Sequence, residues 1–147
     1  MLKSSSTPHP THPVVQRTIL VVDDILSVRY YHSYILKKAG FKCETASDGV
    51  EALQKLRMGA IDLVLLDVIM PNLNGWDFIK QLRHEPALAK IPVLVISSEP
   101  LSDKVCKESS AGMGAVGYAK KPISPESLYP IIEQLLGVSC GLSAQVL

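Results

Sequence analysis

Short apolar runs and amphipathic segments alternate along most of the chain. Five of the runs have the length and composition expected of β-strands: TILVV (18–22), KCETA (42–46), DLVLLD (62–67), PVLVISS (92–98) and AVGYAK (115–120). In most of them the apolar residues are nearly continuous, a pattern typical of strands in a parallel sheet that is covered on both faces. The pattern therefore predicts a buried parallel sheet.

The segments between the runs have apolar residues three or four positions apart, which predicts helices. The apolar face of the first helix is expected to contain Val28, Tyr31, Ile35 and Ala39. Gly40 follows as a C-cap. Asp48, with Glu51 three residues later, is typical of a capping box at the start of the second helix. The remaining helices are expected at residues 75–83, 102–111 and 124–136.

Strands that alternate with helices in this way define a (βα)5 fold of the doubly wound, flavodoxin-like α/β class. Right-handed crossovers place helices on both faces of the sheet, and the expected strand order is 2-1-3-4-5. The 147 residues suit one domain with a single core, which we place at residues 17–137. Residues 1–16 are rich in Ser, Thr, Pro and His and are expected to form a disordered tail, with a C-terminal tail at 138–147.

Acidic residues stand where two of the predicted strands end. Asp23 and Asp24 follow the first strand, and Asp67 ends the third. Ligands of doubly wound sheets bind at the carboxyl ends of the strands, where the first and third strands are neighbours. The three carboxylates are therefore expected to converge at one edge of the sheet. Ser97 leaves the fourth strand at the same edge, and Lys121 leaves the fifth.

The five residues together predict phosphoryl-transfer chemistry. Clustered carboxylates repel one another, and Mg²⁺ relieves this repulsion while its retained waters leave room for a phosphate group. A carboxylate between Mg²⁺ and the ammonium group of Lys121 is placed to attack phosphorus, and the product is an aspartyl phosphate. The Ser97 hydroxyl can donate a hydrogen bond to the phosphate oxygens. Each residue alone has a more ordinary interpretation, as a helix cap, a turn residue or a solvated side chain.

Charge and composition narrow the class of function. The formal net charge of +1 offers no electrostatic basis for binding nucleic acid or an anionic membrane. No apolar run reaches the roughly 18 residues of a transmembrane helix, and the N-terminal segment lacks the apolar core of a secretory signal. The three cysteines, Cys43, Cys106 and Cys140, are widely spaced, as in proteins of the reducing cytoplasm. We therefore expect a cytoplasmic protein with no nucleic-acid or membrane partner.

Four motifs resemble those of the response-regulator receiver family of two-component systems. They are VVDD (21–24), LLDVIMPNLNG (65–75), VISS (95–98) and GYAKKP (117–122), and the resemblance extends over about residues 17–137. It implies that Asp67 accepts a phosphoryl group from a sensor histidine kinase or a phosphotransfer domain. It also implies that Asp23 and Asp24 hold Mg²⁺, with Asp24 and Asp67 as direct ligands together with the backbone carbonyl of Ile69.

The resemblance also implies how the signal leaves the domain. Lys121 contacts the phosphoryl group, while Ser97 and Tyr118 form a switch pair in which the hydroxyl moves toward the phosphate and the aromatic ring rotates inward. A downstream protein then binds the face made by the fourth helix, fifth strand and fifth helix. Such a domain changes only its own phosphorylation state, so it is not expected to be an enzyme with a separate substrate.

Two departures from the family pattern fall on that output face. The glycine-rich link at residues 112–117 is about two residues longer than usual, and Pro130 lies inside the last predicted helix. Proline removes a backbone donor, so it is expected to kink or shorten the helix. Only ten residues follow Gly137, which suggests a stand-alone, CheY-like receiver in a chemotaxis-like or pilus-motility pathway, or a receiver fragment of a hybrid kinase.

Other classes fit the sequence less well. A phosphatase with an aspartyl nucleophile carries a second Asp two residues after the first, where this chain has Ile69. Neither a dinucleotide-binding nor a P-loop glycine motif follows the first strand. A receiver-fold scaffold that is never phosphorylated is the remaining alternative. Loss of an acidic residue or of the lysine would be its expected signature, and none of them is lost.

Overall fold

The structure, a computed structural model, describes residues 16–67, 75–97 and 116–137 of the chain. The predicted helix at 102–111 and the glycine link up to residue 115 lie outside the described residues. The elements are β1 (Thr18–Val22), α1 (Leu26–Lys38), β2 (Lys42–Ala46), α2 (Gly49–Arg57), β3 (Leu63–Asp67), α3 (Gly75–His84), β4 (Val93–Ser97), β5 (Val116–Lys120) and α5 (Pro125–Leu136). Each strand lies within the range predicted for it.

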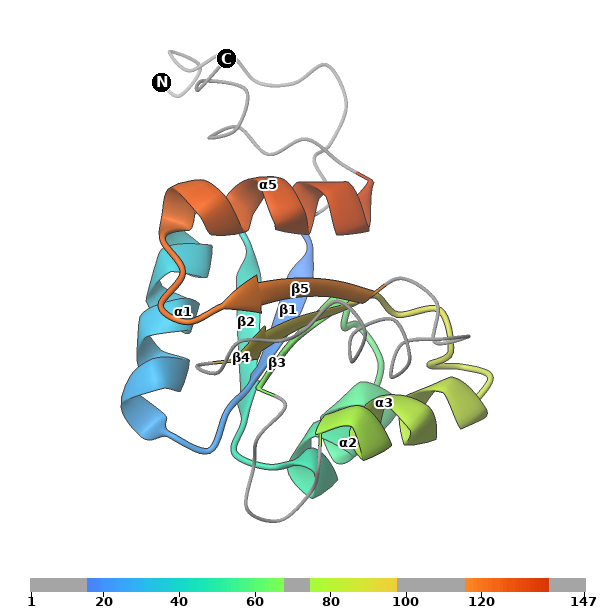
Figure 1. Cartoon of the computed structure of the whole chain (residues 1–147). Coiled ribbons are helices and arrows are strands. Elements are labelled where there is room, and N and C mark those ends of the chain that lie inside the picture. Colours follow the sequence, from blue (N-terminus) through green and yellow to red (C-terminus); the bar gives the residue numbers. More distant parts are fainter. Residues whose placement is uncertain (1–15, 68–74, 98–115, 138–147) are drawn as a thin grey trace, which may run out of the picture.

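All five strands are parallel, and their order is β2-β1-β3-β4-β5 (Figure 1). Because alternate strand residues point to opposite faces, each central strand contributes to two apolar clusters. Leu20 and Val22 of β1 pack with residues of α2 and α3, whereas Ile19 and Val21 pack with residues of α1 and α5. The doubly wound, flavodoxin-like fold predicted from the sequence is confirmed.

The start of α2 is held by reciprocal hydrogen bonds. The backbone amide of Glu51 donates to Oδ1 of Asp48 at 2.8 Å, and the amide of Ser47 donates to Oε1 of Glu51 at 2.8 Å. The hydrogen bond from the Ser47 amide is the main reason why the pKa of the Glu51 carboxyl is lowered. Asp48 therefore caps the helix as predicted, but Glu51 accepts from the amide of Ser47, one residue before the cap, and not from that of Asp48 as a strict capping box requires.

The buried face of α1 is rotated from the predicted one. His32, Ser33, Ile35 and Leu36 are buried, whereas Tyr31, which was predicted to face the core, is 44% exposed. Ile35 and Leu36 pack in the apolar cluster on one face of the sheet. Gly40 has a φ of 98° and ends the helix, as predicted.

Helix α5 continues through Pro130, so this proline does not shorten the helix, and a kink at Pro130 stays a prediction. Leu128 and Ile132, on either side of it, are fully buried against the sheet, and Gly137 ends the helix with a φ of 69°. Burial of these two residues offsets the backbone hydrogen bond that proline cannot make. Ser124 begins the helix by accepting a hydrogen bond from the amide of Ser127.

Replacing Pro130 with Ala is expected to stabilise the protein. Pro130 is exposed and lies in the helix interior, where alanine restores a hydrogen bond and is favoured by about 1 to 3 kcal/mol. Urea unfolding should show a higher midpoint with an unchanged slope. Pro125→Ala is the matched control, because proline is well tolerated in the first turn of a helix. Equal effects of the two substitutions would contradict this explanation.

Candidate functional site

Three carboxylates meet at the carboxyl ends of β1 and β3. The two strands pair directly, with Val22 opposite Leu66, so Asp23 and Asp67 leave the sheet side by side. One oxygen from each of Asp23, Asp24 and Asp67 lies within 4.8 Å of the others. Asp23 and Asp67 are 0% and 6% exposed, whereas Asp24 faces solvent. The structure therefore brings together the three carboxylates that were selected from the sequence.

Lys121 joins this acidic cluster from the end of β5. Its Nζ lies 2.6 Å from Oδ2 of Asp23 and 3.4 Å from Oδ2 of Asp67. Its backbone amide donates to the carbonyl of Ser97 at 2.7 Å, which ties the lysine to the end of β4. Two buried carboxylates thus share one largely buried ammonium group, and the four side chains carry a formal charge of −2. Lys120, its neighbour, is exposed.

The loop between β1 and α1 is held in place by hydrogen bonds around Asp23. The Asp23 amide donates to the Ala46 carbonyl at 3.1 Å, and its Oδ1 accepts from the Ile25 amide at 3.0 Å. Arg29 donates from Nη1 to the Asp23 carbonyl at 2.7 Å. Asp23 already uses both carboxylate oxygens, one for Ile25 and the other for Lys121. Asp24 is consequently the more available ligand of the pair.

Arg29 was not selected from the sequence, although it fixes the backbone of the acidic loop. Its position in the first turns of the predicted helix, six residues after Asp23, was the available signal. A long basic side chain there can reach back to a loop carbonyl, but many such side chains are simply solvated. Only the folded geometry distinguishes the two cases.

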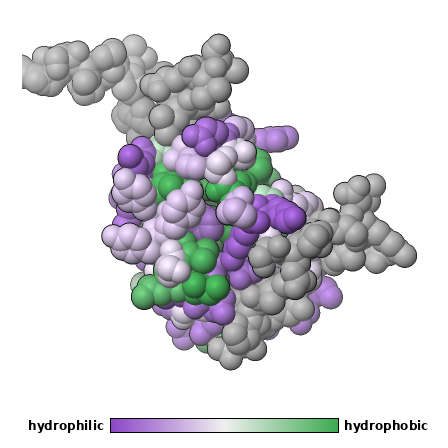
Figure 2. Space-filling view, turned by 60° about the vertical axis from the view of Figure 1, so that its left-hand side comes forward, coloured by the Kyte–Doolittle hydropathy of each residue, from purple (hydrophilic) through white to green (hydrophobic). Residues whose placement is uncertain are grey.

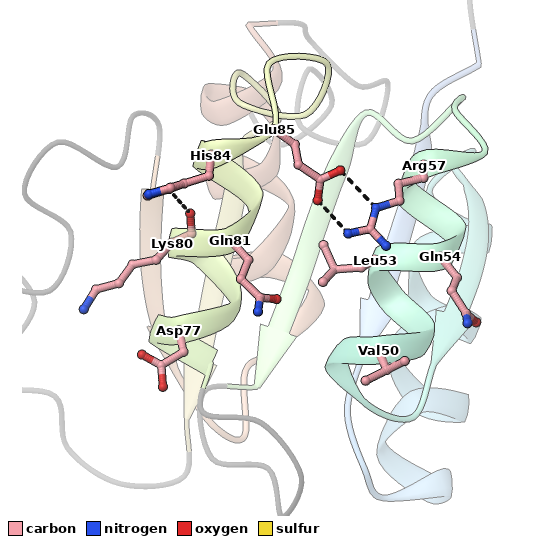
Figure 3. A pocket seen from close by; sticks show the side chains of 9 residues that line it. All are labelled: Val50, Leu53, Gln54, Arg57, Asp77, Lys80, Gln81, His84 and Glu85. Carbon is pink, nitrogen blue, oxygen red and sulfur yellow. Dashed lines mark hydrogen bonds and ion pairs between the residues drawn. The ribbon is translucent and has the colours of Figure 1, made fainter.

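We expect Arg29→Ala to lower the free energy of unfolding by about 1.5 to 2 kcal/mol, because it removes a charged donor from a partly buried carbonyl. Arg57→Ala is the matched control. Arg57 makes a bidentate pair with Glu85 at 2.9 and 2.8 Å at the protein surface, where Arg57 is exposed and Glu85 is partly exposed (Figure 3). Ion pairs at the surface contribute little to stability, because water and salt screen them. Urea unfolding checks both, and a larger effect at Arg57 would contradict the role given to Arg29.

The other predicted site residues are Ser97 at the same edge of the sheet, Tyr118 in the middle of β5, and Ile69. Ser97 ends β4 and is fully buried. Tyr118 lies in β5 and is half-buried, with its ring centroid 6.1 Å from that of Trp76 and the two planes at 47°. Ile69, the predicted backbone ligand, lies outside the described residues. The roles of all these residues stay predictions.

The donor set of the acidic cluster fits a hard divalent cation. Three carboxylates at this spacing offer oxygen ligands of the kind that Mg²⁺ and Ca²⁺ prefer, and Asp24 leaves the site open to solvent. Lys121 neutralises only part of the negative charge, so a cation would be attracted to the cluster. Within the parts of the chain that the structure describes, no helix has the length and apolar character required to cross a bilayer.

A doubly wound sheet with three carboxylates and a lysine at its carboxyl edge defines an acidic site that is open to solvent at Asp24. Comparison with known proteins identifies the class: the response regulator receiver domain family matches residues 19–133, and the chain belongs to this family. It is accordingly a receiver domain of a two-component response regulator. The resemblance drawn from the four sequence motifs is confirmed.

Solved structures support the same conclusion. The chemotaxis protein CheY4 of Vibrio cholerae has a TM-score of 0.76 and 34% identity, over 83% of this chain and 100% of that one. A signal receiver domain of a signal transduction histidine kinase from Syntrophus aciditrophicus has a TM-score of 0.71 and 30% identity, over 82% and 90% of the two chains. A chemotaxis receiver and the receiver domain of a histidine kinase thus share this fold.

Curated relatives are longer proteins. The alkaline phosphatase synthesis transcriptional regulatory protein PhoP of Bacillus subtilis is 37% identical over 122 residues, which are 83% of this chain and 49% of PhoP. The probable transcriptional regulator ycf29 of Porphyra purpurea is 32% identical over 118 residues, 80% of this chain and 55% of that protein. The chain spans about half the length of these relatives.

Proposed function

We propose that the protein is a Mg²⁺-dependent phosphoacceptor in which Asp67 takes a phosphoryl group from a sensor histidine kinase or a phosphotransfer domain. The observation that carries this proposal is the position of Asp67 beside Asp23, Asp24 and Lys121. The ammonium group supplies positive charge to the phosphate, and the three carboxylates can hold a cation that supplies more.

The reaction follows from the arrangement of the side chains. A carboxylate oxygen of Asp67 attacks phosphorus, the new bond is an acyl phosphate, and the phosphorus–nitrogen bond to the donor histidine breaks. Asp23, Asp24 and Asp67, with the backbone carbonyl of Ile69, would hold Mg²⁺, which when bound supplies positive charge to the phosphoryl oxygens. Lys121, with its Nζ 3.4 Å from Oδ2 of Asp67, supplies a second positive charge.

The proposed output is a change in the surface around β5. Ser97 would donate its hydroxyl to a phosphoryl oxygen, and the half-buried ring of Tyr118 would move inward, which shifts an equilibrium between two surfaces. A downstream protein recognises the phosphorylated surface. The likeness to CheY4, named as a chemotaxis protein, supports a chemotaxis-like pathway, and a pilus-motility pathway stays a prediction from the sequence. The likeness to a histidine-kinase receiver equally supports a receiver that is part of a hybrid kinase.

We further propose that the domain has no substrate apart from its own phosphoryl group, and that it works in the cytoplasm. The pKa of the Cys43 thiol is raised to about 11, mainly by burial, so this thiol stays protonated and unreactive at neutral pH. A free thiol of this kind suits a reducing compartment.

Intact-mass spectrometry after incubation with acetyl phosphate tests the proposal. In the presence of Mg²⁺ the protein should gain the mass of one phosphoryl group, and chelation of the metal should prevent the gain. A protein that gains no phosphoryl group from acetyl phosphate or from a histidine kinase is a receiver-fold scaffold instead. An equal gain with and without Mg²⁺ would contradict the proposed metal dependence.

Asp24→Asn is expected to weaken Mg²⁺ binding by at least about tenfold, because it removes the most accessible carboxylate of the cluster. Fluorescence of Trp76, the only tryptophan, offers a readout close to Tyr118, and titration calorimetry an independent one. Asp62→Asn is the matched control. Asp62 precedes β3 at the opposite edge of the sheet, where it accepts a hydrogen bond from the Thr18 amide. Equal weakening by the two substitutions would argue against a specific site.

A further inference from the structure

A cavity lies beside the acidic cluster, between α1 and the segment that joins β5 to α5. Its volume is about 370 Å³, at the lower end of the roughly 300 to 1,000 Å³ typical of small-molecule sites. Val28 and Tyr31 line it from α1, and Pro122 and Ile123 line it from the connecting segment. Figure 2 turns the side of the molecule that carries α1 toward the viewer, with apolar surface exposed between polar side chains.

His32 is a buried polar side chain in the wall of this cavity, which Ser27 and Lys121 also line. The side chain lines the cavity and is 3% exposed, and its Nδ1 has no hydrogen-bond partner among the residues that the structure describes. A buried polar atom usually has a partner, because leaving it unpaired opposes folding. The Tyr31 ring, with its centroid 5.5 Å from that of His32, provides an aromatic wall but no such partner.

Charge at the cavity favours a neutral molecule. Burial lowers the pKa of His32, the positive charge of Lys121 lowers it further, and Asp23 opposes the shift. The imidazole is therefore neutral at pH 7, with one donor nitrogen and one acceptor nitrogen. Lys121 at the wall repels cations, and the acidic cluster next to it, with its formal charge of −2, repels anions. A hydroxyl group can pair with either imidazole nitrogen, since it both donates and accepts.

We propose that this cavity, which we name the α1 pocket, binds a small uncharged molecule that has an apolar body and a hydroxyl group, such as a phenol. The ring or alkyl part packs against Val28, Tyr31 and Ile123, and the hydroxyl pairs with Nδ1 of His32, which is itself buried and reaches the cavity when the imidazole turns toward it. The site is distinct from the proposed phosphorylation site, although the two share Lys121.

Titration of the full chain with 4-methylphenol, followed by NMR, tests the α1 pocket. Binding should shift the imidazole nitrogens of His32 and the backbone amides of Val28, Tyr31 and Ile123. Toluene, which has the same shape without the hydroxyl, should bind about threefold to tenfold more weakly, the effect of one neutral hydrogen bond. Equal affinity for both probes, or no shift at these residues at millimolar concentrations, would overturn the proposal.

Two variants and a control separate the pocket from the rest of the surface. In His32→Phe the preference for 4-methylphenol over toluene should disappear. In Val28→Trp, at the half-buried edge of the cavity, both probes should lose binding while the spectrum remains that of a folded protein. Tyr30→Ala is the control, because Tyr30 lies on the same helix but is 74% exposed and does not line the cavity. An unchanged preference in His32→Phe would refute the role of Nδ1.

Because Lys121 borders both sites, occupancy of the α1 pocket is expected to change Mg²⁺ affinity, an effect that rests on the proposed function. Mg²⁺ titrations with and without saturating 4-methylphenol should differ by about twofold or more, which is a small coupling. Identical Mg²⁺ affinities would overturn this linkage alone. Shifts at His32 do not require phosphorylation, so failure of the α1 pocket and failure of the phosphoacceptor proposal are distinguishable.

Discussion

Asp67→Asn is expected to abolish formation of the phosphoryl adduct with acetyl phosphate and Mg²⁺. The amide has the shape of the carboxylate but lacks the nucleophilic, charged oxygen that attacks phosphorus. The fold should be retained, because Asp67 sits in a cluster with an excess of negative charge and losing one charge relieves repulsion. Intact-mass spectrometry of the variant should therefore show only the unmodified protein, with a wild-type circular dichroism spectrum.

Asp77→Asn is the matched control for this substitution. Asp77 lies in the first turn of α3 and is exposed, so it shares residue type with Asp67 but not the environment of the cluster. The control should form the adduct at the wild-type rate. If Asp67→Asn still gained a phosphoryl group at that rate, another residue would be the acceptor and the proposed chemistry would be wrong.

Lys121→Met is expected to lower both the free energy of unfolding and the rate of phosphoryl-adduct formation. Asp23 is fully buried and its carboxylate lies 2.6 Å from Nζ of Lys121, so the substitution leaves a buried charge without its ammonium partner. Breaking such a pair costs about 3 kcal/mol or more, and added Mg²⁺ should restore part of it. Removal of a charge that stabilises the transition state should slow adduct formation by about a hundredfold or more.

Lys120→Met separates these effects from a general change in charge. Lys120 directly precedes Lys121 but is exposed, and among the described residues no ion pair joins it to the acidic cluster. It should leave both the urea midpoint and the rate of adduct formation near their wild-type values. A larger loss in Lys120→Met than in Lys121→Met would show that the wrong lysine had been assigned to the site.

The fold and the acidic cluster could be predicted because the order of apolar and amphipathic segments in the sequence is compatible with few folds. Nearly continuous apolar runs separated by helical segments leave little choice but a covered parallel sheet. Once β1 and β3 are neighbours, residues that end those strands must lie together. Asp23 and Asp67 therefore lie beside each other, although Asp67 comes 44 residues after Asp23 in the sequence.

Features that depend on side-chain direction could not be predicted in the same way. The apolar spacing of α1 places Tyr31 inward, but the packing of Ile35 and Leu36 turns the helix so that His32 is buried instead. The reach of Arg29 back to a loop carbonyl depends on the same rotation. Likewise, the expectation that proline interrupts a helix considers only the lost backbone hydrogen bond. It does not include the burial of Leu128 and Ile132, which stabilises α5 on both sides of Pro130.

The most direct test of the central claim is to locate the phosphoryl group. The wild-type protein, treated with acetyl phosphate and Mg²⁺, would be digested and analysed by tandem mass spectrometry before and after treatment with hydroxylamine, which cleaves acyl phosphates. The proposed function predicts one phosphoryl group, on the peptide that contains Asp67, and its loss in hydroxylamine. A hydroxylamine-stable group on another residue, or no modification even with a histidine kinase as donor, would contradict it.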